Sequence, residues 1–197
     1  MTEVDTTGLL VGPDGRSRCS WAGSAPEYLG YHDDEWGVPV HGESALYERI
    51  TLEAFQSGLS WLTILRKRPA FRAAFAGFDP ERGAAFADAD RSRLMAAPGI
   101  VRNARKVDAA IVNARAVLDL RDEGGLDAYL WSFAPEHHQP PQSPAELRAT
   151  SPESVALAAG LKGRGFVFVG PTTAYAAMQA CGLVDDHLAG CFRAAAT

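Results

Sequence analysis

The stretch HLAGC, from His187 to Cys191, places two good metal ligands four residues apart near the end of the sequence. Residues at this spacing lie on one face of a helical turn. A structural zinc ion takes four ligands, usually Cys thiolates and His nitrogens. Cys19 and His32 offer the same two residue types near the other end of the sequence. The sequence therefore predicts a Cys₂His₂ zinc site.

Such a site would join the two ends of the chain. Closing a long loop lowers the entropy of the unfolded chain, so the clip would stabilise the fold without touching a substrate. Asp185 and Asp186 directly precede His187 and could accept from an imidazole N–H. The spacing alone also fits buried thiols beside hydrogen-bonded histidines, or a Cys–His nucleophilic pair that lacks an orienting partner.

A second cluster combines aromatic rings with one carboxylate within the first 61 residues. The rings are Trp21, Tyr28, Tyr31, Trp36 and Trp61. Glu53 lies in the mostly apolar stretch ITLEAFQSGLSW, next to the inward positions of an expected helix. A carboxylate there costs free energy unless it has a partner, and a flipped nucleobase held between aromatic rings is one such partner. The alternative is an aromatic core with a surface Glu.

The stretch APGIVRNARKVDAAIVNA, residues 97–114, has a Pro-Gly-Ile turn between two expected helices. With the short helix before it, the segment 91–114 matches a helix-hairpin-helix. Gly99 would let the backbone approach a phosphate, and Arg102, Arg105 and Lys106 would add charge beside the N–H groups of the second helix. Such a unit binds the DNA backbone without reading sequence. A tight turn between two core helices is the alternative.

Helices are expected to position these residues. Apolar spacing and cap residues predict helices over 26–35, 43–57, 61–67, 69–75, 91–96, 102–120, 128–133, 151–161 and 171–181. Gly58 is expected to end one helix and Ser60 to cap the next. Only GFVFVG, residues 165–170, has the composition of a strand. The sequence therefore predicts an all-α fold, with a flexible tail over 1–17 and one domain of two helical lobes over 18–197.

Composition narrows the class of protein further. The 197 residues are 47% hydrophobic and 22% charged, as in ordinary globular proteins. The sequence has neither a long apolar run nor a secretory signal, which predicts a cytoplasmic protein without a membrane partner. Three cysteines in a reducing compartment favour metal binding or burial over disulfides, and Cys181 is expected in the core. The net charge of −5 argues mildly against nucleic acid, but the basic residues cluster.

From Arg18 to Cys191 the chain resembles the 3-methyladenine DNA glycosylase I family. The motifs that carry the resemblance are CSW, YHDDEWGVP, LEAFQSGLSW, PGIVRNARK, WSF, GFVFVG and MQACGLVDDHLAGC. The resemblance implies a compact helix-hairpin-helix glycosylase fold with a zinc clip between the N- and C-terminal segments. One departure is the longer loop WSFAPEHHQPPQSP with its doubled histidine, which affects loop contacts only.

The resemblance also implies roles for residues. The structural zinc would be held by Cys19, His32, His187 and Cys191. The damaged base would be hydrogen-bonded by Glu53 and Tyr31, stacked on Trp61, and surrounded by Trp21, Tyr28 and Trp36. Gly58 and Leu59 would enter the space beside the lesion. The family lacks the catalytic Asp of many helix-hairpin-helix excision enzymes, and neither Asp119 nor Asp122 is predicted to take that role.

The function implied is hydrolysis of the N-glycosidic bond of 3-methyladenine in alkylated double-stranded DNA, which leaves an abasic site. Lys106 is interpreted as a phosphate contact, so no Schiff-base nucleophile and no strand cleavage are expected. We expect a monomer without an organic cofactor. The alternatives are a non-catalytic, zinc-stabilised DNA-binding protein and, more distantly, a binder of small nucleobases or nucleosides. The first would have no reason to keep Glu53 in an aromatic pocket, and the hairpin argues against the second.

Overall fold

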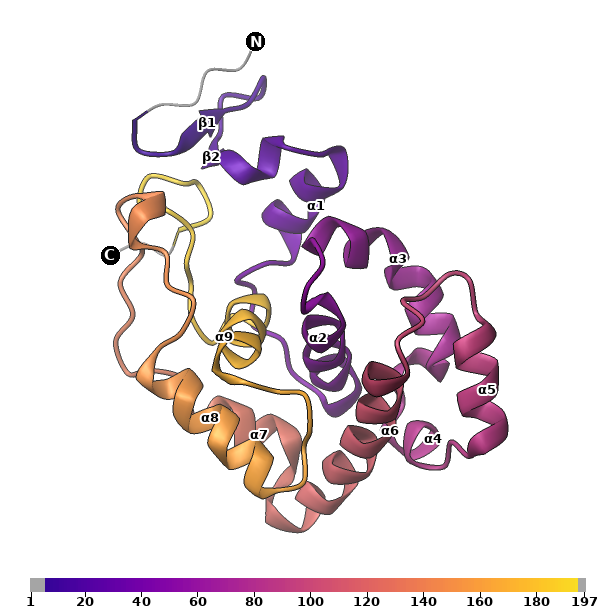
Figure 1. The fold of residues 1–197 in the computed structure, drawn as a ribbon. Coiled ribbons are helices and arrows are strands. Elements are labelled where there is room, and N and C mark those ends of the chain that lie inside the picture. The colour runs from indigo at the N-terminus through magenta and orange to yellow at the C-terminus, as the bar shows by residue number, and fades with distance from the viewer. Residues whose placement is uncertain (1–5, 195–197) are drawn as a thin grey trace.

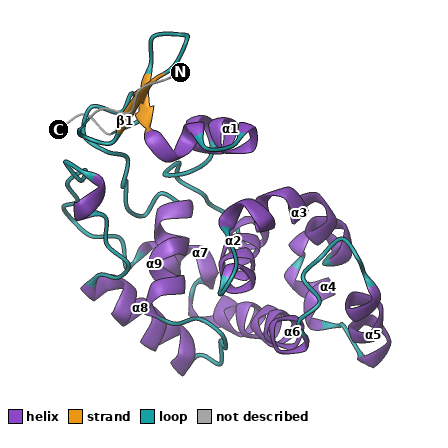
Figure 2. Cartoon of the chain, turned by 45° about the horizontal axis from the view of Figure 1, so that its top comes forward, coloured by secondary structure: helices purple, strands orange, loops and turns teal. Residues whose placement is uncertain are grey.

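A computed structural model describes residues 6–194 of the chain, which are mostly helical (Figure 1). The α-helices are α1 (Pro26–Asp34), α2 (Glu43–Gln56), α3 (Trp61–Ala74), α4 (Pro80–Ala84), α5 (Asp88–Ala96), α6 (Ala104–Asp119), α7 (Gly125–Trp131), α8 (Pro152–Gly163) and α9 (Pro171–Ala180). The strands β1 (Leu9–Val11) and β2 (Ser17–Cys19) form a small antiparallel hairpin, with Leu10 opposite Arg18. Figure 2 shows how small this hairpin is beside the helices. The prediction of a mostly helical protein is confirmed.

Helix α2 lies at the centre of the molecule, with α9 on one side and α3 and α6 on the other (Figure 1). Every residue from Leu46 to Phe55 is buried, including the charged residues Glu48, Arg49 and Glu53. A helix that is surrounded on all sides must place its polar groups against specific partners, because no face is left for solvent. The position of α2 therefore decides the environment of each polar side chain it carries.

The N-terminal region corrects the sequence analysis. Residues 6–17 were expected to belong to a flexible tail, but β1 pairs with β2, and the backbone N–H of Phe192 donates to the carbonyl of Ser17 at 2.8 Å. The hairpin is thus fastened to the C-terminal segment. Three-residue strands with one long-range partner have no periodicity that a sequence could reveal. The part of the expected tail over 1–5 lies outside the described residues.

Two further predictions of local structure were wrong. Helix α3 runs through Pro69, which was expected to start a new helix, since Ile64 and Phe71 on either side are both buried in the main core. The segment 165–170 forms a loop instead of a strand. The side chain of Asn113 binds both the carbonyl of Val167 (3.1 Å) and its N–H (2.8 Å), which gives the extended chain the partner that a neighbouring strand would supply.

None of the helices in residues 6–194 combines the length and apolar character that crossing a membrane requires.

Candidate functional site

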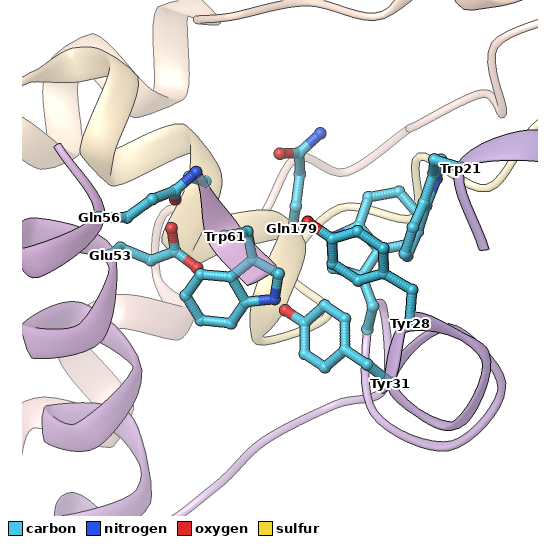
Figure 3. A pocket seen from close by; sticks show the side chains of 9 residues that line it. Trp21, Tyr28, Tyr31, Glu53, Gln56, Trp61 and Gln179 are labelled. Carbon is cyan, nitrogen blue, oxygen red and sulfur yellow. The ribbon is translucent and has the colours of Figure 1, made fainter. Parts of the chain in front are cut away.

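A cavity of about 270 Å³ opens between α1, α2, α9 and the start of α3 (Figure 3). Its lining is aromatic and polar, with one carboxylate. The lining residues are Trp21, Tyr28, Tyr31, Trp36, Glu53, Gln56, Trp61, Ala176 and Gln179. The fold therefore brings together the carboxylate and all the rings that the sequence analysis grouped. The volume suits one small planar ligand.

The rings support one another at the pocket wall. The ring of Trp21 lies edge-on to Tyr28 (centroids 5.6 Å apart) and to Trp36 (5.2 Å). Across the pocket, Tyr31 and Trp61 are 5.4 Å apart and tilted by 45°. Edge-to-face contacts of this kind add to the gain from burial and fix the ring orientations. The pocket is therefore built of faces set for stacking before any ligand enters.

Glu53 projects from α2 into this pocket and is only 6% exposed (Figure 3). Burial raises the pKa of its carboxyl to about 8, and the nearby positive charge of Arg49 offsets only part of this. No hydrogen bond to a described residue contributes to the shift. Because desolvation favours the neutral form, a cation in the pocket would lower this pKa again by stabilising the carboxylate. The site thus favours a positively charged ligand.

The two tyrosines differ in what their hydroxyls do. Burial and the neighbouring Glu53 raise the pKa of Tyr31 well above its usual value, so its phenol stays protonated and can donate. The Tyr28 hydroxyl instead accepts the N–H of Leu62 at 3.0 Å, which ties α1 to the first turn of α3. The indole N–H of Trp61 is buried without a partner among the described residues. Tyr31 therefore offers a hydrogen-bond donor to a ligand, and the N–H of Trp61 is a buried donor in the same wall.

Two glutamines of the pocket were missed from the sequence. Gln56 lies three residues after Glu53 on α2, and this helical spacing could have identified it. Gln179 lies on α9, and its amide nitrogen donates to the buried Asp186 at 2.7 Å. That contact leaves the amide oxygen for the pocket. No local pattern marks Gln179, because its place depends on how α9 packs against α2.

The turn between α2 and α3 lies at the edge of the pocket. Gly58 has φ +81°, which ends α2 in the left-handed conformation, and Ser60 caps α3 by accepting the N–H of Thr63. Leu59 between them is 42% exposed. A second cavity of about 320 Å³, lined in part by Glu53, Gly58 and Leu59, adjoins the pocket here. An exposed apolar side chain thus stands directly beside the pocket.

The structure corrects the role expected for Lys106. Its side chain is 6% exposed, and Nζ donates to the carbonyls of Phe55 (2.7 Å) and Ser57 (2.5 Å). Desolvation lowers its pKa. A buried ammonium held by two carbonyls is not placed to contact a phosphate. Lys106 instead binds the C-terminal carbonyls of α2, which carry the negative end of the helix dipole.

The segment predicted as a hairpin consists of α5, a turn and α6. The side chain of Asn103 caps α6 by accepting the N–H of Lys106 at 3.2 Å. Arg102 and Arg105 are exposed beside this helix start. A Cβ on Gly99 would lie 2.7 Å from the Cβ of Ala70, so the close approach of the turn to α3 already requires glycine there.

A third cluster lies behind the pocket. The ligand atoms of Cys19, His32 and Cys191, all buried, lie within 4.8 Å of one another. The ring of His187 is 4.8 Å from the ring of His32. The structure thus brings together the four residues that the sequence analysis grouped from opposite ends of the chain.

The geometry of this cluster fits a metal ion. Each imidazole places Nδ1 against a neighbouring carboxylate, His32 against Asp33 at 2.8 Å and His187 against Asp185 at 2.6 Å. These contacts leave Nε2 as the ligand atom on both rings. Nε2 of His187 is buried without a partner among the described residues. A Cys₂His₂ donor set with one orphaned buried nitrogen has the chemistry of a closed zinc site.

Only one of the two predicted acceptors lies beside a ligand histidine. Asp185 contacts His187, whereas Asp186 contacts His138 (2.8 Å), Tyr175 (2.8 Å) and Gln179. His138 belongs to the loop WSFAPEHHQPPQSP. Asp186 therefore connects this loop to α9 rather than supporting the cluster. Cys181 is buried in the main core, as predicted.

Comparison with known proteins gives consistent results. The family model described as Methyladenine glycosylase matches residues 21–194. The chain is 46% identical to the DNA-3-methyladenine glycosylase 1 of Escherichia coli (strain K12), over 88% of this chain and 95% of that one. It is 42% identical to the DNA-3-methyladenine glycosylase of Haemophilus influenzae, over 89% and 96%.

Solved structures agree. A crystal structure of 3-methyladenine DNA glycosylase I has a TM-score of 0.86 and 46% identity, covering 90% of this chain and all of that one. A Staphylococcus aureus structure that concerns 3-methyladenine recognition has a TM-score of 0.86 at 33% identity, over 91% and 97%.

Proposed function

Because this chain belongs to the methyladenine glycosylase family, we propose that it removes 3-methyladenine from alkylated DNA in base-excision repair. The reaction is hydrolysis of the N-glycosidic bond, with water as the nucleophile and an abasic site as the product. The observation that carries this proposal is the buried carboxyl of Glu53, which faces an aromatic pocket of about 270 Å³ and has no hydrogen bond to any residue that the structure describes.

The charge of the substrate explains why so few catalytic groups suffice. 3-Methyladenine in DNA is cationic, so its glycosidic bond is already weak and the base leaves as a neutral molecule. The carboxylate of Glu53 accepts from the N6 amino group and stabilises the positive purine. Tyr31, which remains protonated, supplies a second hydrogen bond. Trp61 stacks on the base, and Trp21, Tyr28 and Trp36 complete the wall.

Selectivity follows from the same desolvation. A neutral adenine in the pocket would leave Glu53 either protonated or buried as an uncompensated charge. A site built around specific polar partners rejects analogues that leave these groups unpaired. The raised pKa of Glu53 supports this account, because burial disfavours the carboxylate when no cation is present.

The enzyme is proposed to be monofunctional. A strand-cleaving lyase needs an amine at the sugar to form a Schiff base. No lysine is among the residues that line the pocket, and the amine of Lys106 is held by the carbonyls of Phe55 and Ser57. The product is therefore an intact strand with an abasic site.

The α5–α6 segment is proposed to act as a helix-hairpin-helix that holds the DNA backbone. The exposed Arg102 and Arg105 beside the start of α6 support this, since a helix N-terminus with adjacent positive charge binds phosphate. Gly99 contributes by permitting the close turn. Backbone contacts of this kind orient double-stranded DNA without reading its sequence, which suits an enzyme that searches for damage.

Cys19, His32, His187 and Cys191 are proposed to bind one structural zinc ion. The orphaned Nε2 of His187 and the carboxylates on both imidazoles support this assignment. The ion would join the N-terminal hairpin to the C-terminal segment and take no part in the reaction. We further propose a cytoplasmic monomer that needs no organic cofactor.

The test is release of free 3-methyladenine from methylated duplex DNA by the wild type and by Glu53→Gln. We expect release by the wild type and a loss of about 100-fold in the variant, the usual scale for removing one electrostatic contact to a transition state. The double variant Glu53→Gln/Gln56→Glu is the control. It keeps one carboxylate in the pocket but places it one helical turn along α2, so it tests whether the position of the carboxylate matters. Equal release by wild type and Glu53→Gln would refute the role of Glu53. Folded protein that binds abasic DNA but releases no base would favour the non-catalytic alternative.

A further inference from the structure

The loop at residues 165–170, which joins α8 to α9 (Figure 1), exposes two large apolar side chains. Val167 is 44% exposed and Phe168 is 40% exposed, whereas the preceding Phe166 is buried. Phe168 has φ +63°, a left-handed conformation that bulky residues rarely adopt. A smaller or more flexible residue would sit there with less strain. The strained backbone places an aromatic ring at the surface, and strained residues of this kind cluster at ligand contacts.

Two buried polar side chains hold this loop in place. Asn113 of α6, which is 1% exposed, binds both backbone groups of Val167. The ammonium of Lys106 lies 5.9 Å from the centroid of the Phe168 ring. A cation and the face of an aromatic ring attract each other, and the attraction is stronger where water is excluded. The exposed ring is therefore part of a fixed structure rather than the tip of a loose loop.

Lys106 also connects Phe168 to the turn beside the pocket. The same nitrogen donates to the carbonyl of Ser57, two residues before Leu59. One buried ammonium thus sets the positions of both Phe168 and the turn that carries Leu59. The two apolar side chains are exposed to a similar extent, 42% for Leu59 and 40% for Phe168.

The surface between them is continuous with the base pocket. The cavity of about 320 Å³ shares Glu53, Gln56 and Ala176 with the pocket and extends to Leu59. A further cavity of about 540 Å³ shares Ser57 and Thr173 with that one and is lined by residues 166–170. Lys162, an exposed cation, also lines it. The Phe168 loop is therefore the far wall of one depression that begins at Glu53.

We propose that Phe168 contacts DNA beside the extruded nucleotide, as a second apolar probe in addition to Leu59. This inference rests on the proposed function. A base leaves the stack only if its neighbours are unstacked, and proteins that deform DNA cover such exposed faces with apolar side chains. The depression leads from the base pocket to Phe168. With the damaged base in the pocket, the neighbouring nucleotide would therefore lie against Phe168. Lys162 adds positive charge on the side where the phosphates would run.

The first measurement is the Kd for a duplex that carries a tetrahydrofuran abasic analogue, at one fixed salt concentration. Loss of an aromatic contact to a base lowers affinity by about tenfold. We expect this loss in Phe168→Ala and Phe168→Gly, and recovery in Phe168→Trp. Binding of free 3-methyladenine, followed by tryptophan fluorescence, is expected to match the wild type. The matched control is Val155→Ala, which removes a 51% exposed apolar side chain from α8, away from the depression.

Phe168→Gly separates a DNA contact from a structural role. Glycine adopts φ +63° without strain, so the melting temperature of this variant is expected to equal or exceed that of Phe168→Ala while DNA binding stays weak. Affinities of both variants equal to that of Val155→Ala would overturn the proposal, as would an equal loss of free-base binding. A change of oligomeric state in the variants, measured by light scattering, would assign the surface to a second copy of the chain instead. A wild type that neither binds nor releases the base would mark failure of the proposed function itself.

Discussion

The base pocket and the Cys/His cluster lie back to back and use their polar groups in opposite ways. Tyr31 and His32 are neighbours on α1, and consecutive residues of a helix point about 100° apart. Tyr31 faces the pocket, and His32 faces the cluster. In the cluster the carboxylates of Asp33 and Asp185 each hold an imidazole. In the pocket the carboxyl of Glu53 has no hydrogen-bonding partner among residues 6–194. Apart from Nε2 of His187, the polar groups of the cluster thus bind one another or the backbone, whereas the carboxyl of Glu53 is left open to the pocket.

Trp21 and Trp36 separate the two sites. The ring of Trp21 lies 5.1 Å from His32 and also packs on the pocket tyrosines, while Trp36 lies 4.7 Å from His187. One layer of rings thus forms the wall of the pocket and the cover of the cluster. Changes in the cluster should act on stability first, and changes in the pocket on ligand binding first. The following variants test that division, from the largest expected effect to the smallest.

Cys191→Ser should destabilise the protein most. It removes one of the four proposed zinc ligands from a buried set, which should cost about 3–5 kcal/mol of unfolding free energy. Urea denaturation with added zinc and with chelator measures this. Cys181→Ser, a thiol in the main core, serves as the control that should not respond to the metal. Wild-type protein with no bound zinc and no response to chelator would contradict the metal assignment.

Glu53→Gln should change the free energy of unfolding in the opposite direction. The variant should be more stable than the wild type but less active. The folded pKa of about 8 lies above the unfolded value of about 4.3. Because the folded pKa is raised, Glu53 contributes fully to the free energy of unfolding below pH ~4.3, where it is protonated in both states. This contribution is lost as the pH rises through about 8. Near pH 8 the variant should be more stable by about 4 kcal/mol, because each unit of pKa shift corresponds to about 1.4 kcal/mol, and near pH 4 the two should be equal. Parallel stability profiles across this range would show that Glu53 is paired like the cluster residues.

Lys106→Met tests a buried charge that binds backbone carbonyls. The carbonyls of Phe55 and Ser57 lose their donor, which should cost about 1–2 kcal/mol and loosen the turn at Gly58. DNA binding should then weaken without the change in salt dependence that loss of a phosphate contact produces. Lys67 makes longer contacts, 3.3 Å to the carbonyl of Gly99, near the surface, so Lys67→Met is the matched control and should cost under about 0.5 kcal/mol. A reduced salt slope in Lys106→Met would restore the phosphate interpretation.

Trp61→Phe and Trp131→Phe should differ least in stability among these variants. They compare an indole N–H that has no partner in the described part of the chain with one that is hydrogen-bonded. The indole N–H of Trp61 has no partner among the described residues, whereas that of Trp131 donates to the carbonyl of Val40 at 3.1 Å. Loss of a made hydrogen bond costs about 1 kcal/mol, so Trp131→Phe should destabilise the protein more. Trp61→Phe should instead weaken binding of free 3-methyladenine. The reverse pattern in thermal denaturation would mean that the pocket is not left open for a ligand.

Several helices could be predicted from the sequence because their signals are local. Ser60 caps α3, Gly58 ends α2, and the apolar spacing within α2 and α6 repeats every three to four residues. The prediction failed where a distant residue decides the conformation. Asn113 replaces the expected strand partner of Val167, and Phe192 holds the hairpin that was taken for a tail. No window of sequence around either segment contains that information.

The same division holds for the candidate site. Residue types and motifs grouped the aromatic rings, Glu53 and the four Cys and His residues that the fold brings together, because chemistry restricts which side chains can stack on a base or bind zinc. The tertiary structure decided the rest. It turned Lys106 from an expected phosphate contact into the anchor of α2, brought Gln179 into the pocket, and set the ring of Phe168 over the ammonium of Lys106. A side chain's type fixes what it can bind, but its partner is fixed by packing across the whole chain, since burial and distance are properties of the folded state.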